Sequence, residues 1–440
     1  MTPPIMSWNK LLATSRLGRE GESPSRDLRS EFQRDADRIV FSSAFRRLQD
    51  KTQVLPLAEN DYVRTRLTHS IEVSAVGRSL GTLAGGVVRD FEGREYAPPA
   101  EFGNVVAAAC LAHDIGNPPF GHPGEDTIRA WFAGPGRDFL TGLSEEEAAD
   151  FLSFEGNAQG FRILSRLQHP ESPGGLQLTH ATLGVFTKYP RGAGRAGTRN
   201  TDNAPPGKHG FSVSDTEAFR TVAEEVGLLI QSPLAWCRHP LAYLVEAADD
   251  ICYRVNDLED ACRLGGISFD ETEELLAPIA TAHGHRPLST LFGGITDSKS
   301  RVELLRARAL NELVNAVADA FRRHYGRLMR GEGLGDLVAL CRYATDMDRV
   351  KAVSVERIYT APQVVEAQAS GAEILWNLLD RFVPLLVNET APRTPIELRD
   401  LAIVAPKVRH DTSRYQRLLS ATDFISGMTD TYAVTQFHWS

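Results

Sequence analysis

The feature that most constrains the fold is a short segment with no polar face. Residues 104–113 read NVVAAACLAH, and IGNPPFG follows one residue later. A helix that is apolar on all sides is expected to be buried, because every face of it would otherwise meet water. Glycine and proline break helices, so this one should end at His113 and Asp114 and then turn sharply. The sequence therefore predicts a buried helix that ends on a histidine and an aspartate.

Helical periodicity dominates the rest of the chain, with apolar residues recurring every three to four positions. Helices are predicted over residues 30–49, 66–91, 215–231, 240–263, 299–330, 346–369, 371–390 and 411–437. Asp215 is placed to cap the helix that follows it. Regular strand alternation is confined to short candidates near 353–360. The predicted fold class is mainly α, and 440 residues allow either one large globule or a domain with an appended bundle.

Composition narrows the class of protein. The net charge of −9 does not favour broad nucleic-acid binding, although a small anionic ligand needs only a local basic pocket. The first 18 residues lack the apolar core of a signal peptide, and no run of about 18 apolar residues occurs, so we expect no membrane span. Five cysteines without a CxxC pair indicate reduced thiols in a cytoplasmic protein.

A candidate metal site surrounds His113 and Asp114. Where a chain leaves helical geometry, adjacent histidine and aspartate can reach one metal, and this donor pair suits Mg, Mn, Fe or Zn. The dipeptide alone is common, and an ordinary capped helix end is the alternative. Two other residues strengthen the metal hypothesis: His69, on the preceding helix, and Asp249, in an apolar run. Two imidazoles and two carboxylates would leave coordination positions open for water and a phosphate oxygen.

The segment LVEAADDICYRVNDLED places a polar face on an otherwise apolar helix. Asp249, Tyr253 and Asp257 are spaced i, i+4 and i+8, so they share one face. Buried carboxylates are costly unless they are paired or ligate a metal. His122 and Glu125 follow the His–Asp pair in the Gly/Pro-rich loop. With four candidate ligands already present, His122 and Glu125 are not needed to bind the metal. Titratable groups beside a metal are what proton transfer to a leaving oxygen would require.

Residues 189–210 interrupt the helical pattern with glycine, proline, asparagine and basic residues. The segment is either an ordinary surface loop or a lid that closes over an anionic ligand. Lys188 and Lys208 flank it.

These blocks resemble the HD-domain superfamily of metal phosphohydrolases, whose pattern is H…HD…D. Within it, the chain is similar to the deoxyguanosine triphosphate triphosphohydrolase family. The similar blocks run in family order from about residue 31 to residue 434. They are EFQRDADRIVFSSAFRRLQDKTQVLP, RTRLTHSIEVS, HDIGNPPFGHPGE, TKYP with the later KHGF, ADDICYRVNDLED and DFISGMTDTYAV.

The resemblance implies a single unit over 1–440, an HD metal-binding core over 60–265 and additional C-terminal helices over 266–440 that contribute to the nucleotide pocket and oligomer contacts. It assigns the metal ligands to His69, His113, Asp114 and Asp249, and the catalytic pair to His122 and Glu125. The substrate-contacting positions match Gln53, Arg66, Lys188, Lys208, Tyr253 and Asp257. Of these, Tyr253 and Asp257 would contact the deoxyribose, and the lysines would bind phosphate.

The implied reaction is hydrolysis of a deoxynucleoside triphosphate, with dGTP expected, to a deoxynucleoside and tripolyphosphate. The expected cofactor is a divalent metal, Mg or Mn first, with Co or Fe as further options. A homo-oligomer is expected, and whether it is a hexamer and whether a dNTP acts as an allosteric ligand both stay open. Despite the acidic net charge, a local groove for nucleic acid on an oligomer also stays open. Two other functions stay open: a different HD-domain nucleotide phosphohydrolase, and a nucleotide-sensing regulator with weak catalysis.

Overall fold

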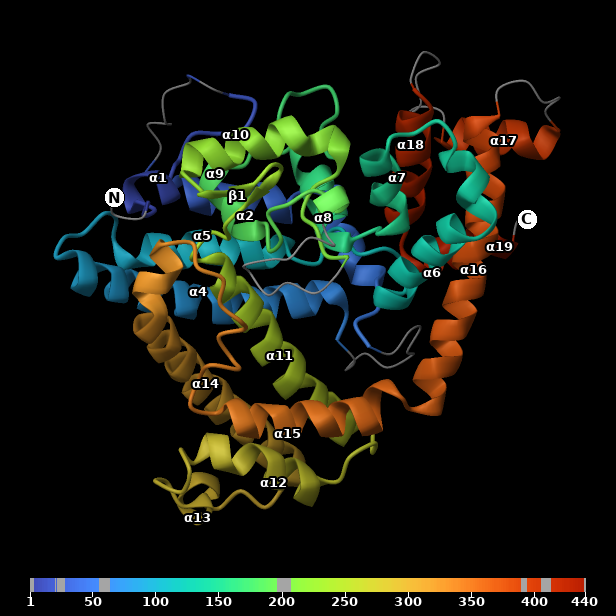
Figure 1. Ribbon diagram of the computed structural model, residues 1–440. Coiled ribbons are helices and arrows are strands. Elements are labelled where there is room, and N and C mark those ends of the chain that lie inside the picture. The colour runs from blue at the N-terminus through green and yellow to red at the C-terminus, as the bar shows by residue number, and fades with distance from the viewer. Residues whose placement is uncertain are drawn as a thin grey trace.

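The computed structural model describes residues 4–19, 21, 28–54, 64–195, 207–388, 394–404 and 413–438. The mainly α prediction is confirmed, since the described residues contain many helices and a single two-stranded antiparallel sheet, β1 (Ile230–Ser232) with β2 (Ala235–Trp236). Figure 1 shows the helices arranged around the long pair α4 and α5, with the C-terminal helices along one side. In the part of the chain that is described, no helix combines the length and apolarity that crossing a membrane requires.

The N-terminal half holds short helices around two long ones. Its elements are α1 (Trp8–Leu11), α2 (Glu31–Val40), α3 (Ser43–Arg47), η1 (Leu48–Asp50), α4 (Arg66–Glu92), α5 (Pro99–Ala112), α6 (His122–Ala133), η2 (Pro135–Leu140), α7 (Glu145–Leu152), α8 (Gly156–Arg162), η3 (Ile163–Leu167), α9 (His180–Phe186), η4 (Ala193–Arg195), η5 (Val213–Asp215) and α10 (Thr216–Val226).

The C-terminal half is built from longer helices. They are α11 (Ala242–Arg263), α12 (Phe269–Ala280), α13 (Leu288–Phe292), α14 (Ser298–Met329), α15 (Ala344–Ser354), η6 (Val355–Tyr359), α16 (Pro362–Val387), α17 (Pro395–Val404), α18 (Arg414–Ser426) and α19 (Asp430–His438). Figure 1 shows α15 crossing the far end of α11, and α16 running alongside α6 and α18.

Helix α4 approaches α5 closely through glycines. A Cβ on Gly77 would lie 2.4 Å from Cys110 Sγ, and one on Gly81 would lie 2.4 Å from the Phe102 carbonyl oxygen. Ser74 Oγ, on the same face, donates to the Ala107 carbonyl at 3.0 Å. These residues are spaced about one turn apart, so the face of α4 that contacts α5 consists of residues with small side chains. The two helices therefore pack backbone to backbone over much of their length.

Two apolar clusters form the interior. The larger one joins α2, α4, α5, α9, α10, α11 and α14. The smaller one joins α6 and α7 to α16, α18 and α19, with Trp131, Phe151 and Phe382 almost fully buried. The C-terminal helices thus share their core with the two helices that follow the Gly/Pro-rich loop.

Several expected boundaries are corrected. The helix predicted over 30–49 is broken at Ser42, whose Oγ accepts a hydrogen bond from the Phe45 amide and caps a new helix. Strand candidates near 353–360 are wrong, because residues 355–359 form a π-helical turn. Asp215 is the N-cap residue of α10, as predicted, but its carboxylate makes no capping hydrogen bond and accepts from Ser212 Oγ instead. The long helix predicted over 411–437 is divided between α18 and α19.

Asp150 connects three segments that are distant in sequence. It lies on α7, is 6% exposed, and accepts hydrogen bonds from Tyr415 Oη at 2.5 Å and from the Val213 amide at 2.9 Å. Burial raises the pKa of Asp150 from 3.8 to about 7. The folded protein therefore keeps a proton on Asp150 over a pH range in which the unfolded chain releases it.

This difference predicts a pH-dependent contribution to stability. Between pH 3.8 and about 7 the folded state binds more protons at Asp150, so the free energy of unfolding should fall as pH rises through that window. Asp150→Asn should remove this component. In urea unfolding across the window, the free energy of unfolding of the wild type minus that of the variant should fall as pH rises. The control Asp319→Asn, at a side chain 56% exposed, should show no such trend, and a constant difference at Asp150 would contradict the prediction.

Candidate metal and nucleotide site

Three of the four expected metal ligands converge from three helices. His69 lies in the first turn of α4, His113 caps α5 and Asp249 lies on α11. Their ligand atoms all lie within 4.8 Å of one another. His69 Nε2 is 3.0 Å and His113 Nε2 is 3.6 Å from Asp249 Oδ1. The two imidazole rings meet edge to face with centroids 5.3 Å apart.

The donor set fits a divalent metal. His113 Nδ1 bonds the Cys110 carbonyl at 2.7 Å, which turns Nε2 toward the other ligands. That Nε2 is buried and has no hydrogen-bond partner among the described residues. Such an orphaned nitrogen is expected where a ligand is missing. Burial opposes ionisation of Asp249, yet the charges of His113 and His69 hold its pKa well below the usual range.

Asp114, the fourth expected ligand, borders this group but is engaged elsewhere. Its Oδ1 lies 3.5 Å from His113 Nε2 and accepts from Asn117 Nδ2 at 2.5 Å. Its Oδ2 accepts from Arg66 at 2.8 Å. Gly121, with φ of 66°, leaves room for that guanidinium, since a Cβ there would lie 2.4 Å from Arg66 Nη2. Arg66 thus bridges the metal group and the Gly/Pro-rich loop.

The Gly/Pro-rich loop is held by two residues that the sequence reasoning missed, one from the N-terminal half and one from the C-terminal half of the chain. Lys51 Nζ donates to the carbonyls of Asn117 at 2.5 Å and Ser426 at 2.9 Å. Burial, reinforced by a neighbouring arginine, lowers the pKa of Lys51 to about 7. Asp430 accepts from the amide of Phe120 at 3.0 Å. Lys51 and Asp430 both fall inside blocks that carry the family resemblance, which was the one available signal.

The predicted catalytic pair is in contact. His122 Nδ1 lies 3.1 Å from Glu125 Oε2, and its side chain is 75% exposed while that of Glu125 is 1% exposed. The hydrogen bond to Glu125 raises the pKa of His122. Burial would raise the pKa of Glu125, but the hydrogen bond from His122 and the charge of Lys208 lower it overall. Glu125 Oε1 also accepts from the Gly156 amide at 2.7 Å, which fixes its orientation.

Both predicted phosphate lysines pair with carboxylates, one buried and one half-buried. Lys208 Nζ lies 2.7 Å from Glu155 and 3.9 Å from Glu125. Lys188 Nζ lies 3.1 Å from Glu246, which also pairs with a neighbouring arginine. These anchoring carboxylates were missed, because nothing in the sequence pattern assigns them to particular cations. Residues 196–206 of the suggested lid lie outside the described residues.

The predicted sugar residues meet a tyrosine from the C-terminal half. Tyr253 stacks on Tyr359 with centroids 5.3 Å apart and planes 16° apart. Tyr359 Oη donates to Asp257 Oδ2 at 2.6 Å, and burial raises the pKa of Asp257 to about 8. Gln53 lines a small cavity with Asp257 and Arg64. Tyr359 was missed because its segment was interpreted as a strand candidate.

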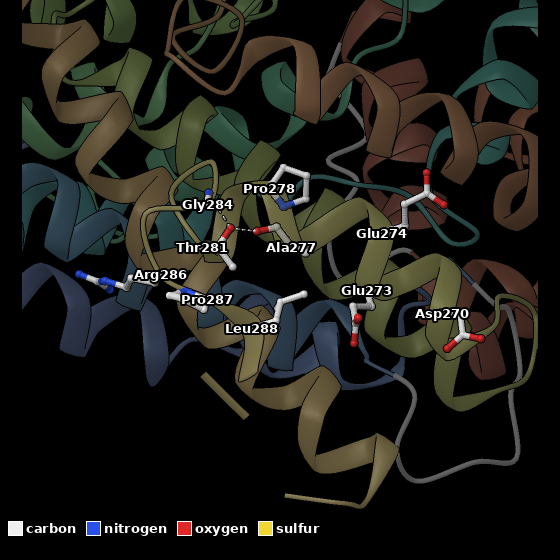
Figure 2. Close-up of a pocket in the computed structure, with 10 residues that line it drawn as sticks. All are labelled: Asp270, Glu273, Glu274, Ala277, Pro278, Thr281, Gly284, Arg286, Pro287 and Leu288. Carbon is white, nitrogen blue, oxygen red and sulfur yellow. Dashed lines mark hydrogen bonds between the residues drawn. The ribbon is translucent and has the colours of Figure 1, made fainter. Parts of the chain in front are cut away.

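A larger groove lies elsewhere, between α12 and the loop that leads into α13. Its volume is about 560 Å³, and Figure 2 shows its side chains. The carboxylates of Asp270, Glu273 and Glu274 lie apart along α12 and do not converge on one point. The groove therefore lacks the gathered donors that distinguish the His–Asp site.

Comparison with known proteins agrees with this geometry. The HD domain family matches residues 66–171, and the phosphohydrolase-associated domain family matches residues 341–439. The first match covers His69, His113 and the Gly/Pro-rich loop. The fold, the site and these matches define an HD-domain phosphohydrolase.

Curated relatives match nearly the whole chain. It is 42% identical to a deoxyguanosinetriphosphate triphosphohydrolase-like protein of Synechocystis sp., over 97% of each chain. It is 40% identical to a protein of that name from Pseudomonas aeruginosa, again over 97% of each. A deoxyguanosinetriphosphate triphosphohydrolase of Salmonella paratyphi A is 31% identical over 95% of each. The chain belongs to the deoxyguanosinetriphosphate triphosphohydrolase-like family.

The geometry predicts the effect of removing one donor. Asp249→Asn keeps the side-chain volume but removes the carboxylate beside both imidazoles. The metal content of purified protein, measured by plasma mass spectrometry, should fall at least about tenfold, since metal sites depend strongly on each charged ligand. Asp250→Asn is the matched control, because that carboxylate pairs with Arg254 instead. Retention of metal by Asp249→Asn would contradict the assignment.

Proposed function

We propose that this protein hydrolyses deoxynucleoside triphosphates, with dGTP as the expected substrate, to a deoxynucleoside and tripolyphosphate. The observation that carries the proposal is the group of His69, His113 and Asp249 beside an exposed histidine, His122, on a buried carboxylate. Arg66, which bonds Asp114 and lies against Gly121, links the metal group to the turn that carries His122. A metal site and a proton carrier suit phosphoryl chemistry better than ligand sensing. The family of the chain supports the nucleotide as substrate.

His69, His113 and Asp249 would hold the divalent metal, with Asp114 as the candidate fourth ligand and Mg or Mn as the expected ion. When bound, such an ion polarises a phosphate oxygen and lowers the pKa of water. The reaction consumes one water: its oxygen bonds to the α-phosphorus, the bond from that phosphorus to O5′ breaks, and O5′ leaves with a proton.

His122 is the proposed source of that proton. The hydrogen bond to Glu125 raises the pKa of His122, so the protonated imidazole persists to higher pH than for a free histidine. Its exposure lets it reach a substrate oxygen, while buried Glu125 fixes the ring and stabilises its positive charge. His122 would therefore act as the general acid toward O5′ and regain its proton from solvent.

Arg66, Lys188 and Lys208 are proposed to bind the triphosphate. Each is already held near the site by a carboxylate: Asp114, Glu246 and Glu155, respectively. Preorganised cations lose little side-chain entropy when an anion arrives. Gln53, Tyr253 and Asp257 would bind the sugar, and a hydroxyl at C2′ would be excluded against the tyrosine ring. The C-terminal part, 266–440, contributes to this pocket through Tyr359.

The products test the function directly. Purified protein incubated with each dNTP and NTP plus Mg or Mn should release intact tripolyphosphate and a deoxynucleoside, resolved by anion-exchange chromatography. Deoxy substrates should be preferred over their ribose counterparts. Release of pyrophosphate, orthophosphate or a monophosphate would indicate another HD-domain phosphohydrolase, and the absence of turnover with bound nucleotide would indicate a sensor.

His122→Ala should separate chemistry from metal binding. Loss of the general acid is expected to lower kcat by about 10²–10⁴-fold, while metal content stays that of the wild type. The matched control is His283→Ala, because His283 is also exposed and also pairs with a carboxylate, Asp346, at 3.0 Å. Turnover near the wild-type rate in His122→Ala would show that another group carries the proton.

A further inference from the structure

Asp257 is already satisfied by a side chain from a distant segment. It lies on α11, is 5% exposed, and accepts a hydrogen bond of 2.6 Å from Tyr359 Oη. The ring of the same tyrosine covers Tyr253. One side chain therefore occupies both features that the proposed function assigns to the sugar: the flat aromatic surface and the buried hydrogen-bond acceptor. A deoxyribose would present the same combination of an apolar face and a hydroxyl.

A small cavity with one unpaired polar atom lies beside this tyrosine. Gln53, Arg64 and Asp257 line a small cavity with Ile358, the residue before Tyr359. Gln53 Oε1 is buried and finds no hydrogen-bond partner among the described residues. A buried amide oxygen without a donor is costly and is expected where a ligand supplies one. The cavity is mostly apolar, and this amide oxygen is the polar group in it that a ligand donor could satisfy.

The segment that carries Tyr359 departs from regular α-helical geometry. It is the π-helical turn η6, between α15 and α16, and such turns are rare and frequently lie at functional sites. Val355, Glu356 and Arg357 are exposed, whereas Ile358 and Tyr359 pack on the larger apolar cluster. Arg357 pairs with Glu271 at 3.2 Å on the surface, an interaction of low stability.

We propose that Tyr359 is a specificity-determining plug, which the sugar hydroxyl of the incoming nucleotide displaces from Asp257. The proposal rests on the proposed function and adds a free-energy cost to nucleotide binding. Every ligand must break the Tyr359–Asp257 hydrogen bond and the stack on Tyr253, so its affinity is reduced by that amount. A nucleotide with a 3′-hydroxyl replaces the lost hydrogen bond, whereas a dideoxynucleotide leaves Asp257 without a donor.

Tyr359→Phe tests the plug, because phenylalanine keeps the stack and removes only the hydroxyl. In the free variant Asp257 lacks its donor, so a ligand no longer has to break that bond. The dissociation constant for dGTP, measured by calorimetry on EDTA-treated protein that cannot turn over, should fall about tenfold. Dideoxy-GTP should bind more tightly by a similar factor. With metal added, KM should fall while kcat stays within about twofold.

Tyr325→Phe is the matched control. Tyr325 Oη also donates to a carboxylate, Glu92, at 2.5 Å. Glu92 is the last residue of α4, ~35 Å along that helix from His69 at 1.5 Å per residue. This variant should bind dGTP as the wild type does. Tyr359→Leu provides a second variant, also expected to bind more tightly, should Tyr359→Phe unfold at a lower temperature than the wild type.

The outcomes separate the two proposals. If wild-type protein binds and hydrolyses dGTP but Tyr359→Phe binds it equally or more weakly, the plug is wrong and the proposed function stands. Weaker binding would mean that the hydroxyl supports the bound state instead of opposing it. If the wild type neither binds dNTPs nor releases tripolyphosphate from them, both proposals fail together.

Discussion

The close approach of α4 to α5 is the constraint on which the site depends. Gly77 and Gly81 allow the α4 backbone to lie against Cys110 and Phe102, where any Cβ would collide. This contact brings His69, at the start of α4, within reach of His113, at the end of α5. Helix α11 then packs on both and adds Asp249. Three donors from three helices can hold one ion only because the interior is densely packed and keeps their spacing fixed.

Around this framework, cations and carboxylates form pairs that nucleotide binding would rearrange. Arg66, Lys188 and Lys208 lie against buried or half-buried carboxylates, and Tyr359 lies against Asp257. In the ligand-free chain these internal partners satisfy groups that would otherwise be buried alone. The proposed triphosphate and sugar would take over some of the same partners. Binding would then exchange interactions and not simply add them, which favours specificity over raw affinity.

Much of the helical architecture could be predicted, because apolar periodicity survives in a single sequence. The buried helix that ends at His113 and the long α4 and α14 follow the predicted ranges closely. Local competition explains the errors. Ser42 offers a side-chain cap that divides one predicted helix, and the β-branched residues of 353–360 imitate a strand although the segment forms a π-helical turn. In α4 the buried face includes small residues such as Ser74 and Gly77, which apolar periodicity does not count. The apolar side chain of Ile71 therefore lies on another face and is 52% exposed.

The sequence by itself determined the fold class, the family and the residue types of the metal group, because motif spacing and apolar patterning are local properties of the chain. Only the tertiary structure decided which charges meet. It placed Asp114 against Arg66, held the Gly/Pro-rich loop between Lys51 and Asp430, and put Tyr359 on Asp257 across a separation of 102 residues. Such pairings depend on how the helices pack in three dimensions, and the pattern of residues along one chain does not show which distant residues will lie in contact.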